Sequence, residues 1–474
     1  MAFSGRSIWD VRTTGSDTNG GAFIQDAAGS DYSQQNSPQY SGTDLEINGS
    51  NNLQVKSTTA GSPIAADVGN LIMVSNGLSW TFGWYEIVSQ DGTWWTLDRS
   101  PGSAGITGGH FAVGGALASP GVAVAVGQGY YTGSNLRAVV YIQSGTYAIT
   151  NNTTATPVPA SGCYIKDARS SNIYGYDSTN GRGSKPTTYP ILQSQSGHTD
   201  YVYHGSYSGN ASYNFGKIMW LELDGNGLPG SNRSVCYRPS EAWECTIKGA
   251  KGGACADGGQ YWHCTIDATG MNAYQAALTG MGYYCYINSG SYRAYAINGT
   301  GAFHCVVRGG TSSYPVIRIG RHGRLVGCRV YSISGSSPLV YQPTQHQTIL
   351  NNIFVGGVGT PNLFSPTTPS GMWSGSVFKG NYYYNCNNTS LSGLTPGFAD
   401  LEEAVALSQD PFVDAANGDF TLDSSGADYA SVLSANYGGL TVENTSLGPR
   451  VSSFTENVGG GSTVQTVASI ERLK

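Results

Sequence analysis

The sequence predicts a mainly β protein whose central part is a β-solenoid, a stack of similar coils built from short strands. Glycine contributes 67 of the 474 residues and only 11% of residues are charged, which is typical of short strands joined by many turns. A cysteine also recurs about every twenty residues in similar, largely apolar hexamers. Repetition at that period without a helical pattern indicates a solenoid.

The chain before the repeats divides into two parts. Residues 1–35 are polar and glycine-rich with little periodicity, and we expect an N-terminal segment or anchor there. Residues 36–135 contain alternating runs, for example at 71–77 and 84–89, bounded by Gly, Asp, Asn and Ser. This pattern predicts a small β-domain followed by a connector. The connector, 108–129, consists of small residues, and we expect a short helix at its centre.

Residues 136–395 form the predicted solenoid. Five cysteines mark its clearest units, with spacings of 19, 21, 20 and 23 residues: Cys245, Cys264, Cys285, Cys305 and Cys328. Asn352 continues the series in "ILNNIF". Each unit therefore contains at least one strand at an equivalent position.

The hexamers also predict which side chains point inward. Alternate residues of a strand share a face, so an inward cysteine places inward the residues two before it and two after it. The first set is Trp243, Trp262, Tyr283, Phe303 and Val326, and the second is Ile247, Ile266, Ile287, Val307 and Val330. The residues directly before the cysteines face outward in this register: Glu244, His263, Tyr284, His304 and Gly327.

Residues 396–474 are expected to form a C-terminal cap and a polar tail. "LEEAVAL" (401–407) predicts a short helix, and the following residues predict a closing turn. Residues 440–474 are rich in Gly, Ser and Thr, which indicates a loosely packed or partner-docked tail. A repeat array leaves open strand edges at its ends, and we expect the N-terminal domain and residues 396–430 to cover them.

The repeat, the inward ladder and the closing segment resemble the right-handed parallel β-helix superfamily, which has the pectate-lyase-like fold. "VVYIQSGTYAIT" (139–150) resembles the first coil of such helices, and "DPFVDAANGDFTLDSSG" (410–426) resembles the ending of many bacterial and phage members. The resemblance covers about residues 136–430. It implies a family of polysaccharide lyases and hydrolases, phage tailspikes and other virion proteins that bind or cleave glycans. The fold alone assigns no activity.

The cysteine column is best interpreted as packing. Equivalent cysteines in a column cannot all pair, and buried free thiols behave as small hydrophobic groups. A less favoured alternative is one or two disulfides among Cys163, Cys236, Cys255 and Cys386. A zinc site is disfavoured because "CADGGQYWHC" (255–264) lacks the close paired spacing of zinc motifs. We expect no metal and no other cofactor.

Catalytic carboxylates are scarce in the array. Hydrolases need a pair of carboxylates and lyases need acidic calcium ligands with a basic residue, yet no Asp-Asp pair occurs, and no acidic residue lies between Asp267 and Asp400. Glu244, His263 and Asp267 are the remaining weak catalytic candidates, and solvated acids in turns are the simpler interpretation of the two carboxylates.

Basic residues gather in "VIRIGRHGRLVGCRV" (316–330). Arginine pairs well with carboxylates, so these side chains can contact an acidic glycan, another subunit or only solvent. The outward rings of Tyr284 and His304 can stack on sugars or pack against a second subunit. The candidate contact residues are Tyr284, His304, Arg318, Arg321, Arg324 and Arg329.

These observations favour a structural virion protein of a phage or virus: a tailspike, fibre or capsid-surface decoration that presents a glycan- or host-binding β-helix. The net charge of −6 argues against nucleic-acid binding, and no stretch of eighteen apolar residues predicts a membrane span. The N-terminus lacks the pattern of a secretory signal, so we expect a virion component assembled in the host cytoplasm.

The expected partners are the chain itself, as a homotrimer, other virion proteins through the N-terminal region, and cell-surface polysaccharide. Two alternatives remain open. One is a polysaccharide lyase or glycosidase on the same fold. The other is a secreted adhesin or surface protein with an extracellular location.

Overall fold

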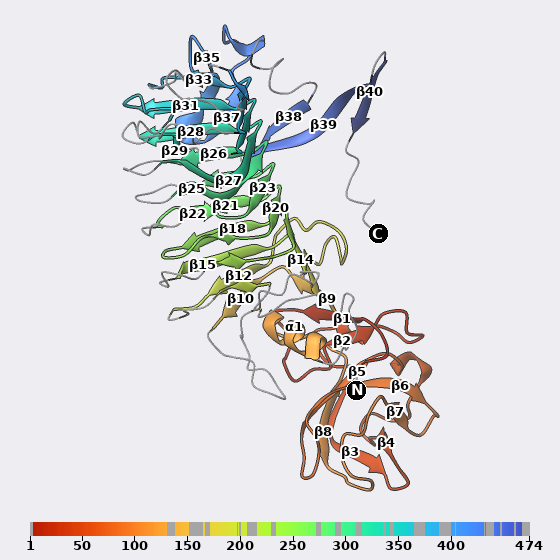
Figure 1. Ribbon diagram of the computed structural model, residues 1–474. Coiled ribbons are helices and arrows are strands. Elements are labelled where there is room, and N and C mark those ends of the chain that lie inside the picture. The colour runs from red at the N-terminus through yellow and green to blue at the C-terminus, as the bar shows by residue number, and fades with distance from the viewer. Residues whose placement is uncertain are drawn as a thin grey trace. The chain divides into compact units, whose positions relative to one another are not determined.

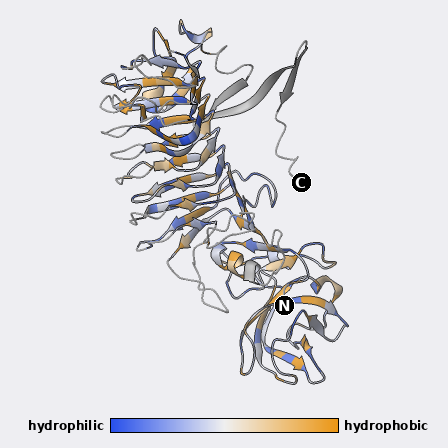
Figure 2. Ribbon diagram, in the orientation of Figure 1, coloured by the Kyte–Doolittle hydropathy of each residue, from blue (hydrophilic) through white to orange (hydrophobic). Residues whose placement is uncertain are grey.

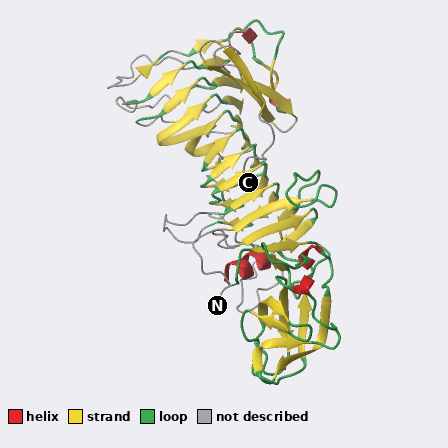
Figure 3. Cartoon of the chain, turned by 90° about the vertical axis from the view of Figure 1, so that its right-hand side faces the viewer, coloured by secondary structure: helices red, strands yellow, loops and turns green. Residues whose placement is uncertain are grey.

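The structure is a computed structural model that describes most of the chain. The described residues are 3–129, 138–150, 165, 171–196, 198, 201–205, 216–228, 234–271, 276–289, 295–309, 315–334, 338–341, 346–364, 375–387, 400–402, 404–430, 432, 440–445, 448–458 and 461–466. For 128–129, 227–228, 400–401, 440–445, 448–458 and 461–466 only the backbone is described. Strands dominate both compact units of the chain, residues 1–224 with 237–241 and residues 225–236 with 242–474, so the all-β class is confirmed (Figure 3).

The first unit contains a closed six-stranded antiparallel barrel. Its strands are, in order around the barrel, β3 (Tyr40–Asn48), β4 (Asn51–Lys56), β7 (Trp95–Leu97), β6 (Gly83–Gln90), β5 (Leu71–Asn76) and β8 (Gly109–Val113). These strands carry both hydrophobic and hydrophilic residues (Figure 2), and the hydrophobic side chains that point inward form one buried cluster that includes Ile47, Val55 and Trp95. The 3-10 turns η1 (Tyr32–Gln34) and η2 (Ala65–Asp67) lie beside it.

Helix α1 (Pro120–Gly129) follows the barrel and is the helix expected in the connector, although it occupies the connector's second half rather than its centre. Pro120 lies at the first helical position, where its missing N–H is not needed. Among the described residues, no helix is long and apolar enough to cross a membrane.

The first unit also contains parallel strands. These are β1 (Ser7–Val11), β9 (Ala138–Gln143), β11 (Ser171–Tyr176) and β14 (Lys217–Met219) in one sheet, and β10 (Thr146–Ile149), β12 (Ile191–Ser194) and β15 (Glu222–Leu228) in another. Strands β2 (Ala22–Ile24) and β13 (Tyr203–His204) complete the unit. The N-terminal residues thus differ from the expected polar segment, because β1 pairs with β9 and Trp9 and Val11 are completely buried.

The second unit stacks short parallel strands one above another (Figure 1). One sheet contains β20 (Gln260–Trp262), β23 (Met281–Tyr283), β25 (Tyr295–Phe303), β27 (Ile317–Val326), β30 (Thr348–Leu350), β32 (Val377–Lys379) and β34 (Asp400–Leu401), together with the short strands β16 (Cys236–Tyr237), β17 (Glu241–Trp243), β19 (Ala256–Asp257), β22 (Ala276–Leu278) and β29 (Val340–Tyr341). The other contains β18 (Thr246–Ala250), β21 (Thr265–Asp267), β24 (Tyr286–Asn288), β26 (Val306–Gly309), β28 (Arg329–Ser334), β31 (Ile353–Val358), β33 (Tyr382–Tyr384) and β35 (Val405–Ala406).

The strands keep the register of the sequence repeat. Ile247 pairs with Ile266, Ile266 with Ile287, and the same column continues through Val307 and Val330. All five side chains are completely buried. Such long parallel sheets, with one rung for each sequence repeat, are consistent with the predicted β-solenoid.

The structure corrects the predicted register at the residue before each cysteine. Glu244, His263, Tyr284 and His304 have φ of 48°, 52°, 54° and 51°, a left-handed conformation that turns the chain between the two sheets. The strand alternation stops there, so the inward residue before the corner is three positions before the cysteine, as at Ala242 and Tyr261, both completely buried. The aromatic residues two positions before the cysteines are therefore on the outer face and are half-buried: Trp243, Trp262, Tyr283 and Phe303.

The cysteines form a column inside the second unit. Cys245, Cys264, Cys285, Cys305 and Cys328 are at most 1% exposed. Cys236, Cys255 and Cys386 are also free, so the disulfide alternative finds no pair among the described cysteines, while Cys163 lies outside the described residues. In the part of the chain that the structure describes, no group of three or more His, Cys, Asp or Glu side chains could hold a metal ion.

Asparagines extend this column by hydrogen bonding. The backbone N–H of Cys328 donates to Oδ1 of Asn352 over 2.9 Å, and the N–H of Asn352 donates to Oδ1 of Asn381 over 3.0 Å. The side-chain amide of Asn352 also donates to the carbonyl of Leu325 over 3.0 Å. Asn352 and Asn381 are almost completely buried, so these bonds satisfy polar groups that water cannot reach.

The C-terminal region differs from the expectation. The described residues of 401–407 contain strands and no helix, because β35 pairs in parallel with β33 and β34 pairs with β32. The following hairpin, β36 (Phe412–Asp414), η3 (Ala415–Asn417) and β37 (Asp419–Leu422), packs on the outer side of the second sheet through Phe412 and Phe420. The tail contains β38 (Leu440–Thr445), β39 (Gly448–Val458) and β40 (Gly461–Thr466), an antiparallel sheet.

Candidate functional site

Two columns of stacked rings run along the outer side of the second unit. In the first, the ring centroids of Trp243 and Trp262 are 5.0 Å apart, those of Trp262 and Tyr283 3.9 Å, and those of Tyr283 and Phe303 5.2 Å. The second contains the corner residues His263, Tyr284 and His304, with centroids 5.2 and 5.3 Å apart. Interplanar angles of 6° to 10° make both columns nearly parallel stacks.

The stacking decides what these rings can bind. A sugar stacks on the face of an aromatic ring, but the faces of rings inside a column already contact their neighbours. The edges of the rings remain. Nδ1 of His304 is buried, so the groups that these edges can offer are the hydroxyl of Tyr284 and the other imidazole nitrogens. The columns are therefore suited to hydrogen bonding along a rigid wall and poorly suited to stacking on sugars.

The second column of rings ends at His304, because the residue at the next corner is a glycine and has no ring. Gly327 occupies the next corner with φ of 64°, and a β-carbon added there would lie 2.4 Å from Nδ1 of His304. Burial lowers the pKa of His304 below its ordinary value of 6.5. No described group lies within hydrogen-bond distance of its Nδ1, and this favours a neutral ring.

Acidification is expected to destabilise the second unit through His304. The folded chain holds this ring neutral at pH values where the unfolded chain already binds a proton. The free energy of unfolding should therefore fall as pH drops below 6.5 and should not depend on this group well above 6.5. His304→Phe keeps a ring in the stack and should weaken that dependence, measured by urea unfolding on both sides of pH 6.5. His110→Phe, in the barrel, is the control variant. If His304→Phe unfolds with the same pH dependence as the wild type, the assignment of that dependence to His304 is wrong.

The weak catalytic candidates serve other contacts. The carboxylate of Asp267 accepts hydrogen bonds from the N–H of Thr269 over 3.0 Å, from its hydroxyl over 2.6 Å and from the side-chain amide of Asn288 over 3.0 Å. Glu244 and His263 lie at corners of adjacent rungs, whereas Asp267 lies in strand β21 beyond the corner. The backbone thus places Asp267 in the second sheet, three residues beyond the cysteine, whereas Glu244 and His263 lie at the corner before it.

The basic residues separate into an exposed and a buried group. Arg318, Arg321 and Arg324 lie on β27 and are exposed; we call them the arginine strip. Arg329 is 5% exposed, and its guanidinium donates to the carbonyl of Phe420 in the C-terminal hairpin. Arg308 likewise donates to the carbonyl of Ala416 over 2.7 Å. Arg329, although a sequence candidate for glycan contact, therefore fastens the hairpin.

Tyrosines on neighbouring rungs position the first arginine of the strip. The guanidinium carbon of Arg318 lies 5.9 Å from the ring centroid of Tyr295 and 6.0 Å from that of Tyr341. Cations are attracted to aromatic faces at such distances. Sequence reasoning missed both tyrosines. One tyrosine lies on the rung before Arg318 and the other on the rung after it, so the repeat length could have indicated them.

The strip lies in a region of one charge sign. Between residues 268 and 399 the chain has seven Lys and Arg residues and no Asp or Glu, although its net charge is −6. Among the ion pairs between described residues, none involves the arginine strip. The strip spans at most about 20 Å along one strand. It can therefore meet several negative groups of a single ligand.

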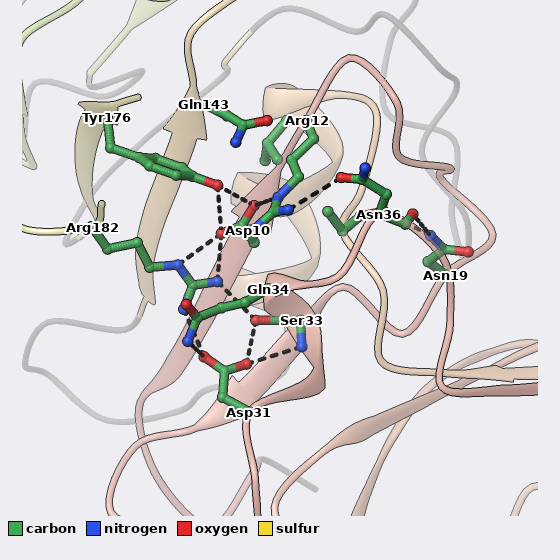
Figure 4. Close-up of polar contacts among 12 residues, drawn as sticks. Asp10, Arg12, Asn19, Asp31, Ser33, Gln34, Asn36, Gln143, Tyr176 and Arg182 are labelled. Atoms are coloured by element: carbon green, nitrogen blue, oxygen red, sulfur yellow. Dashed lines mark hydrogen bonds and ion pairs between the residues drawn. The ribbon is translucent and has the colours of Figure 1, made fainter. Parts of the chain in front are cut away.

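The first unit contains a buried cluster of charged side chains around Asp10 (Figure 4). The carboxylate of Asp10 is completely buried and pairs with Nε of Arg12 over 2.8 Å and with Nη2 of Arg182 over 2.6 Å. The hydroxyl of Tyr176 donates to its oxygens over 2.8 and 3.0 Å. Arg182 also pairs with Asp31 over 2.6 Å. Each oxygen of Asp10 thus has two partners within the chain, which is the arrangement of a structural contact.

Comparisons with known proteins identify no family. No family profile and no curated protein match the chain. Two solved structures are similar. ORF18 of Geobacillus virus E2 is 13% identical over 52% of this chain and 45% of that one, with a TM-score of 0.27. The A-module of the Azotobacter vinelandii mannuronan C-5 epimerase AlgE6 is 12% identical over 60% of this chain and 92% of that one, with a TM-score of 0.29. The chain thus spans less than half of the viral protein.

Proposed function

We propose that the chain is a structural protein of a phage or virus particle, a tailspike, fibre or capsid-surface decoration, built on a right-handed parallel β-helix. Its arginine strip contacts an acidic glycan of the host surface. The protein assembles as a homotrimer in the host cytoplasm, and its N-terminal region contacts other virion proteins.

The arginine strip is the observation that carries the glycan-binding role. Three exposed guanidinium groups on one strand lie in a stretch of 132 residues, 268–399, that has no carboxylate. Such a region attracts polyanions, and guanidinium groups bind carboxylates and sulfates in bidentate geometry. The stacked rings beside it add hydrogen-bonding edges on a rigid support.

The free thiols of the cysteine column favour a protein that folds inside a cell. Eight described cysteines are free, and seven of them are buried. Free thiols are retained in reducing compartments, where virion proteins are assembled. This chemistry favours a virion component over a secreted adhesin.

The binding proposal has a direct test. Arg318→Ala/Arg321→Ala/Arg324→Ala should lower affinity for acidic polysaccharides at least tenfold, since each charge-assisted contact contributes about 1.5–3 kcal/mol. Binding by the wild type should weaken with added salt. Biolayer interferometry on immobilised acidic and neutral polysaccharides measures both effects, with Lys251→Ala, an exposed cation outside the strip, as the control. Equal binding by the triple variant would overturn the glycan-binding role.

The virion role and the enzymatic alternative need separate readouts. Antibodies to the chain should label released particles in electron micrographs, and failure to label them would exclude a particle component. A polysaccharide lyase or glycosidase would instead shorten the bound polymer, with loss of that activity in Glu244→Gln and Asp267→Asn. If the wild type shortens the polysaccharide, the enzymatic alternative replaces the proposal of glycan binding without cleavage, and the labelling of particles still decides the virion role.

A further inference from the structure

The loop between β5 and β6 exposes an apolar side chain almost completely. Leu78 is 91% exposed, and Phe82, at the other end of the same loop, is 37% exposed. Both lie within residues 76–83, at one end of the barrel. A leucine fully in water gains nothing for the folded chain, because hydrophobic stabilisation requires burial.

The loop holds this leucine in a fixed position. Trp80 is 7% exposed, and its indole N–H donates to the carbonyl of Thr107 over 3.3 Å. The N–H of Thr81 donates to the carbonyl of Pro101 over 2.7 Å, which ties the loop to the segment 100–109. Ser79 has φ of 68°, a conformation that costs a non-glycine residue free energy and persists where the surroundings enforce it.

The surroundings of Leu78 carry no charge. Residues 68–85 and 100–109 contain no Asp, Glu, Lys or Arg, whereas residues 40–113 as a whole contain six acidic and two basic residues. Charged residues are depleted in the buried centres of protein interfaces. On an acidic barrel, an uncharged end is also where two copies can meet without like-charge repulsion.

We propose that this barrel end, formed by 76–83 and 100–109, is a contact between copies of the chain, with Leu78 and Phe82 at its centre. The inference rests on the proposed homo-oligomer and names the residues that hold it together. Because Trp80 and Thr81 hold the loop backbone in place, binding requires little additional ordering of the loop, which favours Leu78 as the centre of an interface. A lipid surface is less favoured because no Lys or Arg lies in either segment to attract anionic headgroups.

Sedimentation equilibrium of the full chain tests the proposal. The wild type should associate, and Leu78→Ser and Leu78→Asp should each weaken the association constant tenfold or more. Far-UV circular dichroism should stay unchanged, because Leu78 packs against little in the monomer. Val88→Asp is the matched control, since Val88 is also 37% exposed but lies near the far end of β6.

Other outcomes overturn the inference in distinguishable ways. A wild-type oligomer that resists both Leu78 changes places the contact elsewhere and leaves the proposed virion role intact. A monomeric wild type removes both this contact and the homotrimer. If Val88→Asp lowers the association constant equally, the added charge rather than the loss of Leu78 causes the effect. Binding to phosphatidylcholine vesicles that Leu78→Ser abolishes would assign the loop to lipid. Polysaccharide binding by the same variants reports separately on the arginine strip.

Discussion

Replacing Asp10 with alanine is expected to lower the free energy of unfolding of the first unit by about 3–5 kcal/mol. The change leaves Arg12 and Arg182 facing one another without the carboxylate that neutralises both, and their side chains are only 15% and 12% exposed. It also removes the acceptor of the Tyr176 hydroxyl. Typical domains are stable by 5–15 kcal/mol in total. Urea unfolding followed by tryptophan fluorescence measures the loss.

A paired design keeps this prediction testable if Asp10→Ala does not fold. Asp10→Asn keeps an oxygen acceptor but loses the charge, and Arg182→Gln removes one of the two cations left behind. If uncompensated charge causes the instability, Asp10→Asn/Arg182→Gln should be less destabilised than the sum of the single changes. The exposed pair Glu46–Lys56 is the control, where Glu46→Gln should cost less than about 1 kcal/mol. Simple additivity at Asp10 would contradict the charge explanation.

The period of the cysteines was sufficient to predict the stacked strands, but not the corner beside each cysteine. The inward positions of Ile247 and Ile266 followed from alternation, whereas Trp243 was assigned to the wrong face because alternation stops at a left-handed residue. A signal for that corner was present. His263, His304, Gly327 and Asn351 share the position, and His, Asn and Gly are enriched at positive φ.

Contacts between distant segments were beyond sequence reasoning. "LEEAVAL" has good helix formers, yet Val405 pairs with Tyr382 on the preceding rung, because tertiary pairing outweighs local propensity. Arg318 and Arg329 looked equivalent in one basic segment. The second is buried only because a hairpin that begins about 80 residues later packs over it. Asp10 and Arg182, 172 residues apart, carried no shared signal at all.

Asn352→Leu is expected to lower the free energy of unfolding of the second unit by about 2–5 kcal/mol, since each buried polar group left without a partner costs about 1–3 kcal/mol. The leucine cannot accept from the N–H of Cys328 or donate to the carbonyl of Leu325. Asn352→Cys should cost less, because the N–H of Cys305 already lies 3.4 Å from Sγ of Cys328 in the same relation. Urea unfolding of both variants provides the comparison. Should leucine prove no worse than cysteine, apolar packing rather than hydrogen bonding holds the column together.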